Sequence, residues 1–241
     1  MAADDPRATA LVAAIQTGDV ATLERMLRDD PALATTRIVD AKNASRTLLH
    51  VAADWPGHFP NGARTVAILI AAGTDPDAVC THDEPHGARE TALHWAASSD
   101  DVAVLDALLD GGADIEAPGA VFTNGAPMSD AVIFAQWKAA RRLLERGAKT
   151  TLSQAAALGL LDRVEDSFAS EAHPPDAVTA AFWHACRGGH RPTAEYLLDR
   201  GAKLNWVGWD RKTPFDAAAQ SGNDAFVAWL RARGGRHAAE L

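Results

Sequence analysis

The stretch that decides the fold is residues 91–117, which read TALHWAASSDDVAVLDALLDGGADIEA. Two short apolar segments, 92–97 and 102–109, are separated by small and acidic residues, and the second carries a Leu-Leu pair before Gly111-Gly112. Apolar residues three and four apart cover one face of a helix, and glycines after such a segment end it. The stretch therefore predicts a pair of short helices joined by a tight turn.

The same pattern recurs along the chain. It can be followed in TLLHVAAD (47–54), FWHACRGGHRPTAEYLLDRGAKLN (182–205) and TPFDAAAQSGNDAFVAWLRARGG (213–235). Gly189 and Gly222 are 33 residues apart, as are Gly201 and Gly234. A single helix pair cannot cover its own apolar stripe, so consecutive pairs must stack on one another. The sequence thus predicts a repeat protein built by stacking.

The repeats resemble the ankyrin family, whose pattern is T-P-L-H-x-A-A, a turn, a Leu-rich helix and G-A-D. Its start is matched at 91–94 and 47–50 and, with substitutions, at 126–129 and 213–216; its end is matched at 112–114, 147–149 and 201–203. The resemblance implies an all-α solenoid, a right-handed curved stack of about seven helix-turn-helix units with short β-hairpin finger loops. We expect a single domain over 1–241, with units at about 8–45, 46–88, 89–123, 124–149, 150–175, 176–210 and 211–235.

Two departures from the repeat stand out. The second unit has about five extra residues, 56–60 (PGHFP), between its helices, and their role is open. The fifth unit has no G-A-D finger and ends in a Pro-rich segment, which predicts a bend or interruption near 169–176. Insertions within repeats are often found on the binding face, although surface loops also accept them neutrally.

Composition narrows the class of partner. The chain has 32 acidic and 23 basic residues, a net charge of −9, which disfavours nucleic acid and anionic membranes as partners. Acidic residues precede the first apolar run, and no run approaches the length of a membrane span. Two distant cysteines fit no metal or redox motif. We expect a cytoplasmic, monomeric protein of bacterial appearance, without cofactor or metal.

The resemblance implies that the first helix of each unit lines a concave groove together with the fingers. Two positions per repeat are expected to face this groove. The first is the residue after the T-x-L-H histidine, and it reads Ala13, Val51, Trp95, Asp130, Gln154, His184 and Ala217. The second, three residues later, reads Gln16, Asp54, Ser98, Ile133, Ala157, Arg187 and Gln220. Charged and aromatic residues occupy these positions in the middle of the chain, whereas the first and last repeats have only alanine and glutamine there.

Seven tryptophans against one tyrosine add to this cluster. Trp137 and Trp229 fall on second helices and are expected in the core, while Trp183 stands in the histidine place of T-x-L-H. The candidate ligand- or partner-binding residues are Asp54, Trp55, His58, Trp95, Ser98, Asp130, Gln154, His184, Arg187, Trp206 and Trp209.

The histidines divide by position. His50 and His94 occupy the T-x-L-H place, where the ring is expected to tie the helix start to neighbouring backbone. His184 is displaced by one residue towards the groove, and His58 lies in the insertion without a packing role that the sequence reveals. If the chain is an enzyme, Asp54, Asp130 and His184 are the candidates for acid–base chemistry on a small ligand. No sequence motif specifies a reaction.

Two functions remain open at this point. The first is a non-catalytic module that recognises a protein partner through the concave face and the fingers, as ankyrin arrays commonly do. The alternative is a small-molecule-binding protein or enzyme with a pocket lined by Trp, Asp and His on the concave face. A closed cavity over Trp95 and Asp130 would favour the alternative, and an open groove with exposed Trp206 and Trp209 would favour a protein partner.

Overall fold

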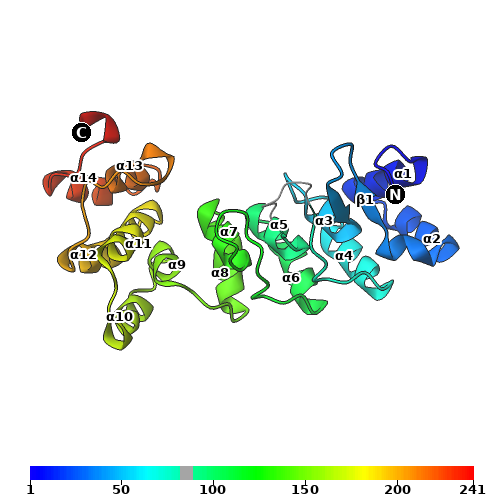
Figure 1. Cartoon of the computed structure of the whole chain (residues 1–241), viewed down its shortest axis with the longest axis horizontal. Helices are drawn as coiled ribbons and strands as arrows, with labels where there is room; N and C mark the ends of the chain where they lie inside the picture. Colours follow the sequence, from blue (N-terminus) through cyan, green and yellow to red (C-terminus); the bar gives the residue numbers. More distant parts are fainter. Residues whose placement is uncertain (82–88) are drawn as a thin grey trace. The chain divides into compact units, whose positions relative to one another are not determined.

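The computed structural model describes residues 1–81 and 89–241, and these form seven pairs of α-helices. The prediction of an all-α fold with about seven helix-turn-helix units is confirmed. The last residues of the second unit, 82–88, lie outside the described part. The pairs, labelled in Figure 1, are α1 (Pro6–Thr17) and α2 (Val20–Asp29), α3 (Leu48–Ala53) and α4 (Gly62–Ala71), α5 (Ala92–Ser98) and α6 (Val102–Asp110), α7 (Pro127–Ile133) and α8 (Trp137–Glu145), α9 (Leu152–Ala157) and α10 (Leu161–Ser170), α11 (Pro175–Arg187) and α12 (Arg191–Asp199), and α13 (Pro214–Ala219) and α14 (Asp224–Ala232).

The repeated threonine explains where several first helices begin. Thr47, Thr91, Thr151 and Thr213 each precede a helix, and each forms a reciprocal capping box with the residue three positions later. Such a box satisfies two backbone N–H groups that the first turn of a helix leaves without partners. The T-x-x-H/Q/D spacing in the sequence is therefore the physical start signal of α3, α5, α9 and α13.

The chain divides into two compact units, Met1–Lys149 and Thr150–Leu241. In the first unit, α1 contacts α3, α3 contacts α5 and α5 contacts α7, while α2, α4, α6 and α8 form a parallel row of contacts. First helices thus pack on first helices, and second helices on second helices. The core between the two rows is aliphatic, and Leu49, Leu69, Leu93, Leu105 and Leu108 are completely buried.

Short extended segments connect the pairs of the first unit. Strands β1 (Arg37–Val39) and β2 (Ser45–Thr47) form an antiparallel hairpin in which Ile38 pairs with Arg46. An isolated bridge joins Ser45 of this hairpin to Thr81 of the next loop, and a second one, between Val79 and Thr91, closes that loop. Three short 3₁₀ helices, η1 (Pro31–Thr35), η2 (Trp209–Arg211) and η3 (Ala238–Glu240), complete the described elements.

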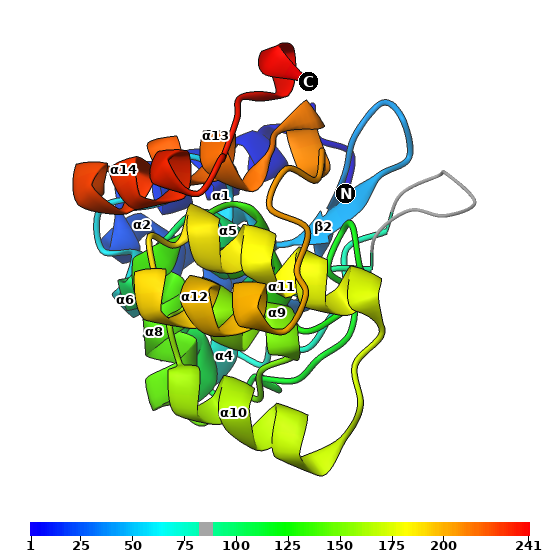
Figure 2. The ribbon, with the colours of Figure 1, turned by 90° about the vertical axis from the view of Figure 1, so that its left-hand side faces the viewer.

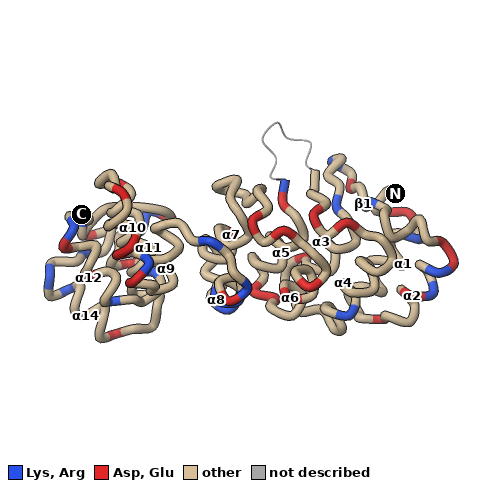
Figure 3. Tube along the Cα trace, turned by 90° about the horizontal axis from the view of Figure 1, so that it is seen from below, with Lys and Arg blue, Asp and Glu red and all other residues tan. Residues whose placement is uncertain are grey.

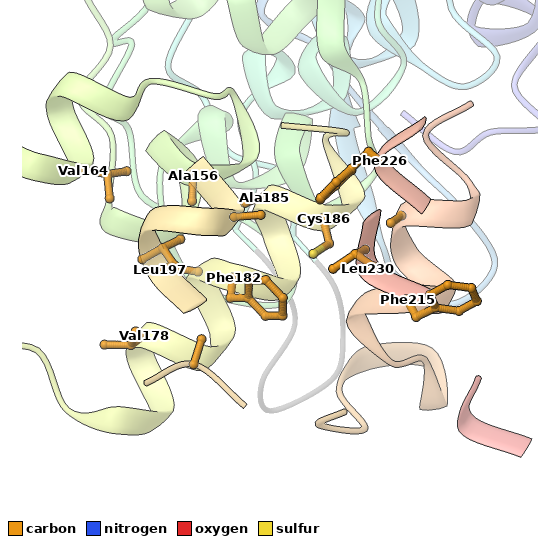
Figure 4. Close-up of a cluster of buried hydrophobic side chains, with 14 of the residues drawn as sticks. Ala156, Val164, Val178, Phe182, Ala185, Cys186, Leu197, Phe215, Phe226 and Leu230 are labelled. Atoms are coloured by element: carbon orange, nitrogen blue, oxygen red, sulfur yellow. The ribbon is translucent and has the colours of Figure 1, made fainter. Parts of the chain in front are cut away.

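The second unit is built around α11, which contacts α9, α12 and α13 (Figure 2). Its core is more aromatic than that of the first unit: Phe182, Phe215 and Phe226 pack with Leu197 and Leu230 (Figure 4). Trp229 is buried, as expected, whereas Trp137 in the first unit is only half-buried.

The prediction of an interruption near 169–176 is wrong. Residues 171–174 only connect α10 to α11, because Pro174 and Pro175 start α11 at once. The α9–α10 pair packs directly on its successor: α9 contacts α11, and the rings of Phe168 and Tyr196 lie 5.7 Å apart, edge to face. The missing G-A-D finger therefore does not break the stack at this point.

The insertion between α3 and α4 joins the first and third helix pairs. The backbone N–H of His58 donates to Asp101 Oδ2 at 2.6 Å, and Asp101 also caps α6 by accepting from the N–H of Val104. Asn61 Nδ2 donates to the carbonyl oxygen of Gly18. Asp101 is buried, so the two backbone donors compensate for the burial of its carboxylate. The insertion thus has a structural role that the sequence did not reveal.

Within the described residues, every helix falls short of the length and apolarity required to span a bilayer.

Candidate functional site

The histidine place of T-x-L-H links each repeat to the next. His50 accepts the N–H of Thr47 at Nδ1, so its Nε2–H donates to the carbonyl oxygen of Glu90 at 3.0 Å. His94 forms the same bridge to the carbonyl oxygen of Gly125 at 3.2 Å. Burial lowers the pKa of both rings to about 4, so they are neutral at physiological pH. The predicted structural role of these two histidines is confirmed.

Other side chains occupy the same place in the second unit. In α11 this place is taken by Trp183, whose indole Nε1–H donates to the carbonyl oxygen of Lys212 at 3.1 Å. Gln154 forms the capping box with Thr151, which puts it in the histidine place itself. The prediction that Gln154 follows the histidine place and faces the groove is therefore wrong by one residue. Its amide oxygen accepts the N–H of Thr151 at 2.8 Å.

The two positions expected to face the groove differ in exposure. At the first position, Val51, Asp130, His184 and Ala217 are buried, and Trp95 is half-buried. The second position holds the more exposed residues, Gln16, Asp54, Ser98, Ile133, Arg187 and Gln220. The fifth repeat is the exception, since Ala157 is buried, and so is Leu158, which takes this position once the repeat is shifted by one residue. The first position is thus mainly a packing position.

In the first unit, Asp130 and Glu90 form a carboxyl pair. The Asp130 side chain is completely buried, and within the described chain neither of its oxygens has a partner at hydrogen-bond geometry. Burial raises the pKa of Asp130 to about 8, and the neighbouring Glu90 carboxylate adds to the rise. Glu90 is itself held by Trp95, whose Nε1 donates to Oε2 at 3.2 Å. Glu90 was not among the sequence candidates, since it stands one residue before the T-x-L-H motif and carries no motif signal.

The remaining candidates of the first unit are held by local contacts. The Ser98 hydroxyl donates to the carbonyl oxygen of Trp95, and Asp54 forms an ion pair with Arg46. Trp55 is 81% exposed. The ring of His58 is also largely exposed and lies 3.9 Å from Asp101, between Nδ1 and Oδ1. These contacts do not bring the four side chains together into one site.

In the second unit, Trp183, His184, Arg187, Trp206 and Trp209 form an aromatic cluster that we call the Trp209 patch. The Trp209 ring centroid lies 5.1 Å from that of Trp183, 4.9 Å from that of His184 and 5.3 Å from that of Trp206. The Arg187 guanidinium stands 5.7 Å from the Trp183 centroid. Trp209 is 48% exposed, so the patch opens to solvent through this ring.

His184 is the buried member of the Trp209 patch and lies beneath the Trp209 ring. Its side chain is buried, and within the described residues Nδ1 has no hydrogen-bond partner. Burial, reinforced by the charge of Arg187, lowers the pKa of His184 to about 4. A neutral, covered imidazole of this kind is a poor general base at neutral pH.

The loop that carries Trp209 is closely determined. Gly208 packs so tightly that a Cβ atom there would lie 2.3 Å from the Trp206 ring. The Gly208 N–H donates to the Lys212 carbonyl oxygen, and the Lys212 N–H donates to that of Trp209. Asp210 and Arg211 both adopt positive φ, of 53° and 57°. Consecutive non-glycine residues in this region are uncommon and persist only where their surroundings hold them.

Surface hollows lie at the fingers. One in the first unit has a volume of about 410 Å³ and is lined by Asp77, Val79, Arg89, Thr91, Asp114, Ala117, Pro118 and Asn124. One in the second unit has a volume of about 610 Å³ and runs from Arg211 and Lys212 to the C-terminal 237–240 segment. Neither wall includes Trp95, Asp130 or Trp209.

Comparison with known proteins agrees with this geometry. Residues 89–120 match the family model of the ankyrin repeat. The ankyrin repeat domain of Bcl-3, described as a unique member of the IkappaB protein family, is 23% identical, with a TM-score of 0.51 over 92% of this chain and 97% of that domain. Residues 89–120 thus match an ankyrin repeat, and the chain has the fold of an ankyrin repeat domain.

The human ASB11 ankyrin repeat domain is another solved structure similar to this chain, at 23% identity. It has a TM-score of 0.45 and covers 80% of this chain and 90% of that domain. Comparison with curated proteins gives no match. At 23% identity the Bcl-3 domain supports the fold alone, and the function must come from the sites of the chain itself.

Proposed function

We propose that this chain recognises a protein partner and that the Trp209 patch anchors the partner. The observation that carries the proposal is an indole nearly half exposed yet fixed by contacts with three other rings. A large ring that is already immobilised loses little conformational entropy on binding, so burying it against a partner yields most of its apolar contribution. Tryptophan is enriched among interface residues whose truncation is costly.

The surroundings of Trp209 also suit a protein interface. Val207 next to it is 46% exposed, and Asp210 and Arg211 are exposed at the edge of the same loop. An apolar centre with a charged rim is the usual anatomy of a protein interface. The loop conformation is held by backbone hydrogen bonds, which limits rearrangement on binding.

The test compares Trp209→Ala with Trp55→Ala, a matched control in the first unit. Partners are captured from lysate by a photo-crosslinking amino acid at Val207, identified, and titrated as purified proteins. We expect the dissociation constant to rise at least tenfold for Trp209→Ala and to change less than twofold for Trp55→Ala. The melting temperature should fall by only a few degrees for either variant. A captured partner that binds Trp209→Ala as well as the unchanged protein contradicts the proposal.

The alternative, small-molecule binding or acid–base chemistry, is favoured by one observation in the first unit. A carboxyl with a pKa of about 8 is poised to donate a proton at neutral pH. A thermal-shift screen of metabolites, repeated with Asp130→Asn, tests this alternative. A metabolite that stabilises the unchanged protein and not the variant supports it, and equal responses in both argue against it.

We also propose a cytoplasmic location and a monomeric state. Cys80 and Cys186 are both buried and are not joined by a disulfide, which suits a reducing compartment. Fractionation of cells that produce the tagged chain tests the location, and light scattering during size-exclusion chromatography tests the state. Recovery outside the cytoplasm, or a mass of twice 25.5 kDa, would contradict them.

A further inference from the structure

We propose that Asp130 and Glu90, with Trp95, form a binding site for the cationic end of a basic side chain, an arginine or lysine, presented by another protein. This site lies in the first unit and is separate from the Trp209 patch. It is tested with small amides, so its failure and the failure of the proposed function can be distinguished.

The first reason is that little in the described part of the chain compensates for the burial of the Asp130 carboxyl. It is completely buried, and its two oxygens have no hydrogen-bond partner at acceptable geometry among the described residues. A buried carboxyl is costly unless hydrogen bonds or a counter-charge compensate for the lost water. The Val121 backbone N–H approaches it but supplies only a small favourable contribution. Apart from the Val121 contact, no donor among the described residues compensates for the burial of the Asp130 carboxyl, and a cation beside it would favour its ionised form.

The second reason is that a second acceptor is fixed beside it. Glu90 Oε2 accepts the Trp95 indole N–H at 3.2 Å, and the Glu90 backbone carbonyl accepts Nε2–H of His50. These bonds hold both the main chain and the side chain of Glu90. A guanidinium carries five N–H donors and an ammonium three, which suits a cation placed between two carboxyl groups.

The third reason is the apolar surface beside the pair. Trp95 is half-buried and packs edge to face on His50, with 4.9 Å between the ring centroids. Phe134 follows Asp130 by one turn of α7 and is 43% exposed, and Phe122, 6.0 Å away, is 69% exposed. The alkyl stem of a basic side chain packs on such rings, and its charged end is attracted to their faces.

The charge of the first unit points to the same ligand. Residues 1–149 hold 21 of the 32 acidic and 13 of the 23 basic residues, a net charge of −8, against −1 for residues 150–241. Figure 3 shows the acidic positions along this unit. The arginines nearest to His50 are engaged elsewhere, since Arg46 pairs with Asp54 and Arg37 donates to Ser45 and Val79. A cation is therefore attracted over a long range as well as held at the pair.

Access to the pair is through its rim. Glu90 and Trp95 are partly exposed, and Asp130 lies beneath them. The turn at 121–124 is exposed and contributes the Val121 backbone that approaches Asp130. A cation first meets Glu90 and then reaches Asp130 by a shift of this turn and of the Glu90 side chain.

The experiment uses the full chain and Nα-acetyl-arginine amide, with Nα-acetyl-citrulline amide as the uncharged isostere. Binding is followed by NMR at the Trp95 indole N–H, which is assigned with Trp95→Phe. We expect the arginine amide to bind at least tenfold more tightly than the citrulline amide. Asp130→Asn should raise its dissociation constant at least tenfold. Asp110→Asn, which removes an exposed carboxylate of the same unit, should change it less than twofold.

Glu90→Gln provides a second variant if Asp130→Asn does not fold, and it too should weaken binding of the arginine amide. Three results would overturn the site. These are equal binding of the citrulline amide, an unmoved Trp95 signal at saturating arginine amide, and unchanged affinity in both carboxyl variants.

Discussion

Replacing Asp130 by Asn should change the pH dependence of the free energy of unfolding. Native Asp130 keeps its proton to about pH 8, whereas the unfolded chain releases it near 3.8. Between these values the native state binds more protons than the unfolded state, so the free energy of unfolding falls as the pH rises. Each pH unit costs about 1.4 kcal/mol, or about 4 kcal/mol between pH 4 and pH 7.

Asn cannot ionise, so this loss should be absent from the variant. We expect both proteins to be similarly stable at pH 4 and the variant to be more stable by several kcal/mol at pH 7, with no further gain above pH 8. Urea denaturation at a series of pH values, followed by circular dichroism, measures the difference. Groups that do not interact with Asp130 titrate alike in both proteins and cancel from the difference, whereas Glu90 is coupled to Asp130 and contributes to it. A pH-independent difference, or a variant less stable at pH 9, would refute the assignment of a buried, protonated Asp130.

Three further substitutions test the packing. Leu108→Ala should cost about 2–5 kcal/mol in urea denaturation by opening a cavity in a fully buried position, and unchanged stability would disprove the stacking register. His94→Ala should cost about 1–3 kcal/mol, because it removes the buried hydrogen bond that joins α5 to the Gly125 carbonyl; hydrogen exchange at the following hairpin should rise, and an unaltered exchange rate would contradict the bridge. Gly208→Ala should displace the Trp206 ring and alter the near-ultraviolet circular dichroism, and an identical spectrum would show that the loop is less tightly packed than described.

The fold was predictable because each repeat carries its own start and stop signals. Thr47, Thr91 and Thr213 cap helices through the residue three positions on, and the Leu-Leu pairs mark the second helices. These signals are local, so each one is visible in the sequence. The expected interruption near 169–176 failed for the complementary reason. A missing finger removes a local signal, but α9 and α11 still bury their apolar faces against each other.

The sites were only partly predictable. Trp95, Asp130, His184 and Trp209 were singled out by position and residue type, and the structure shows how differently they are buried. Glu90 was missed because its partnership with Asp130 joins residues forty positions apart in different repeats. The repeat position of Gln154 was predicted wrongly because glutamine, like histidine, can form the capping box with the threonine three residues before it.

In α3, α5 and α11 the bridge from the first helix to the following loop ends on a main-chain carbonyl: that of Glu90 for His50, of Gly125 for His94 and of Lys212 for Trp183. Every amino acid offers that acceptor, so the joint does not depend on which residue stands there. Whole repeats can therefore be duplicated, deleted or exchanged without redesigning the connection. An array with such joints can gain or lose repeats, in evolution or by protein engineering. Its outward-facing side chains can change independently of the joints.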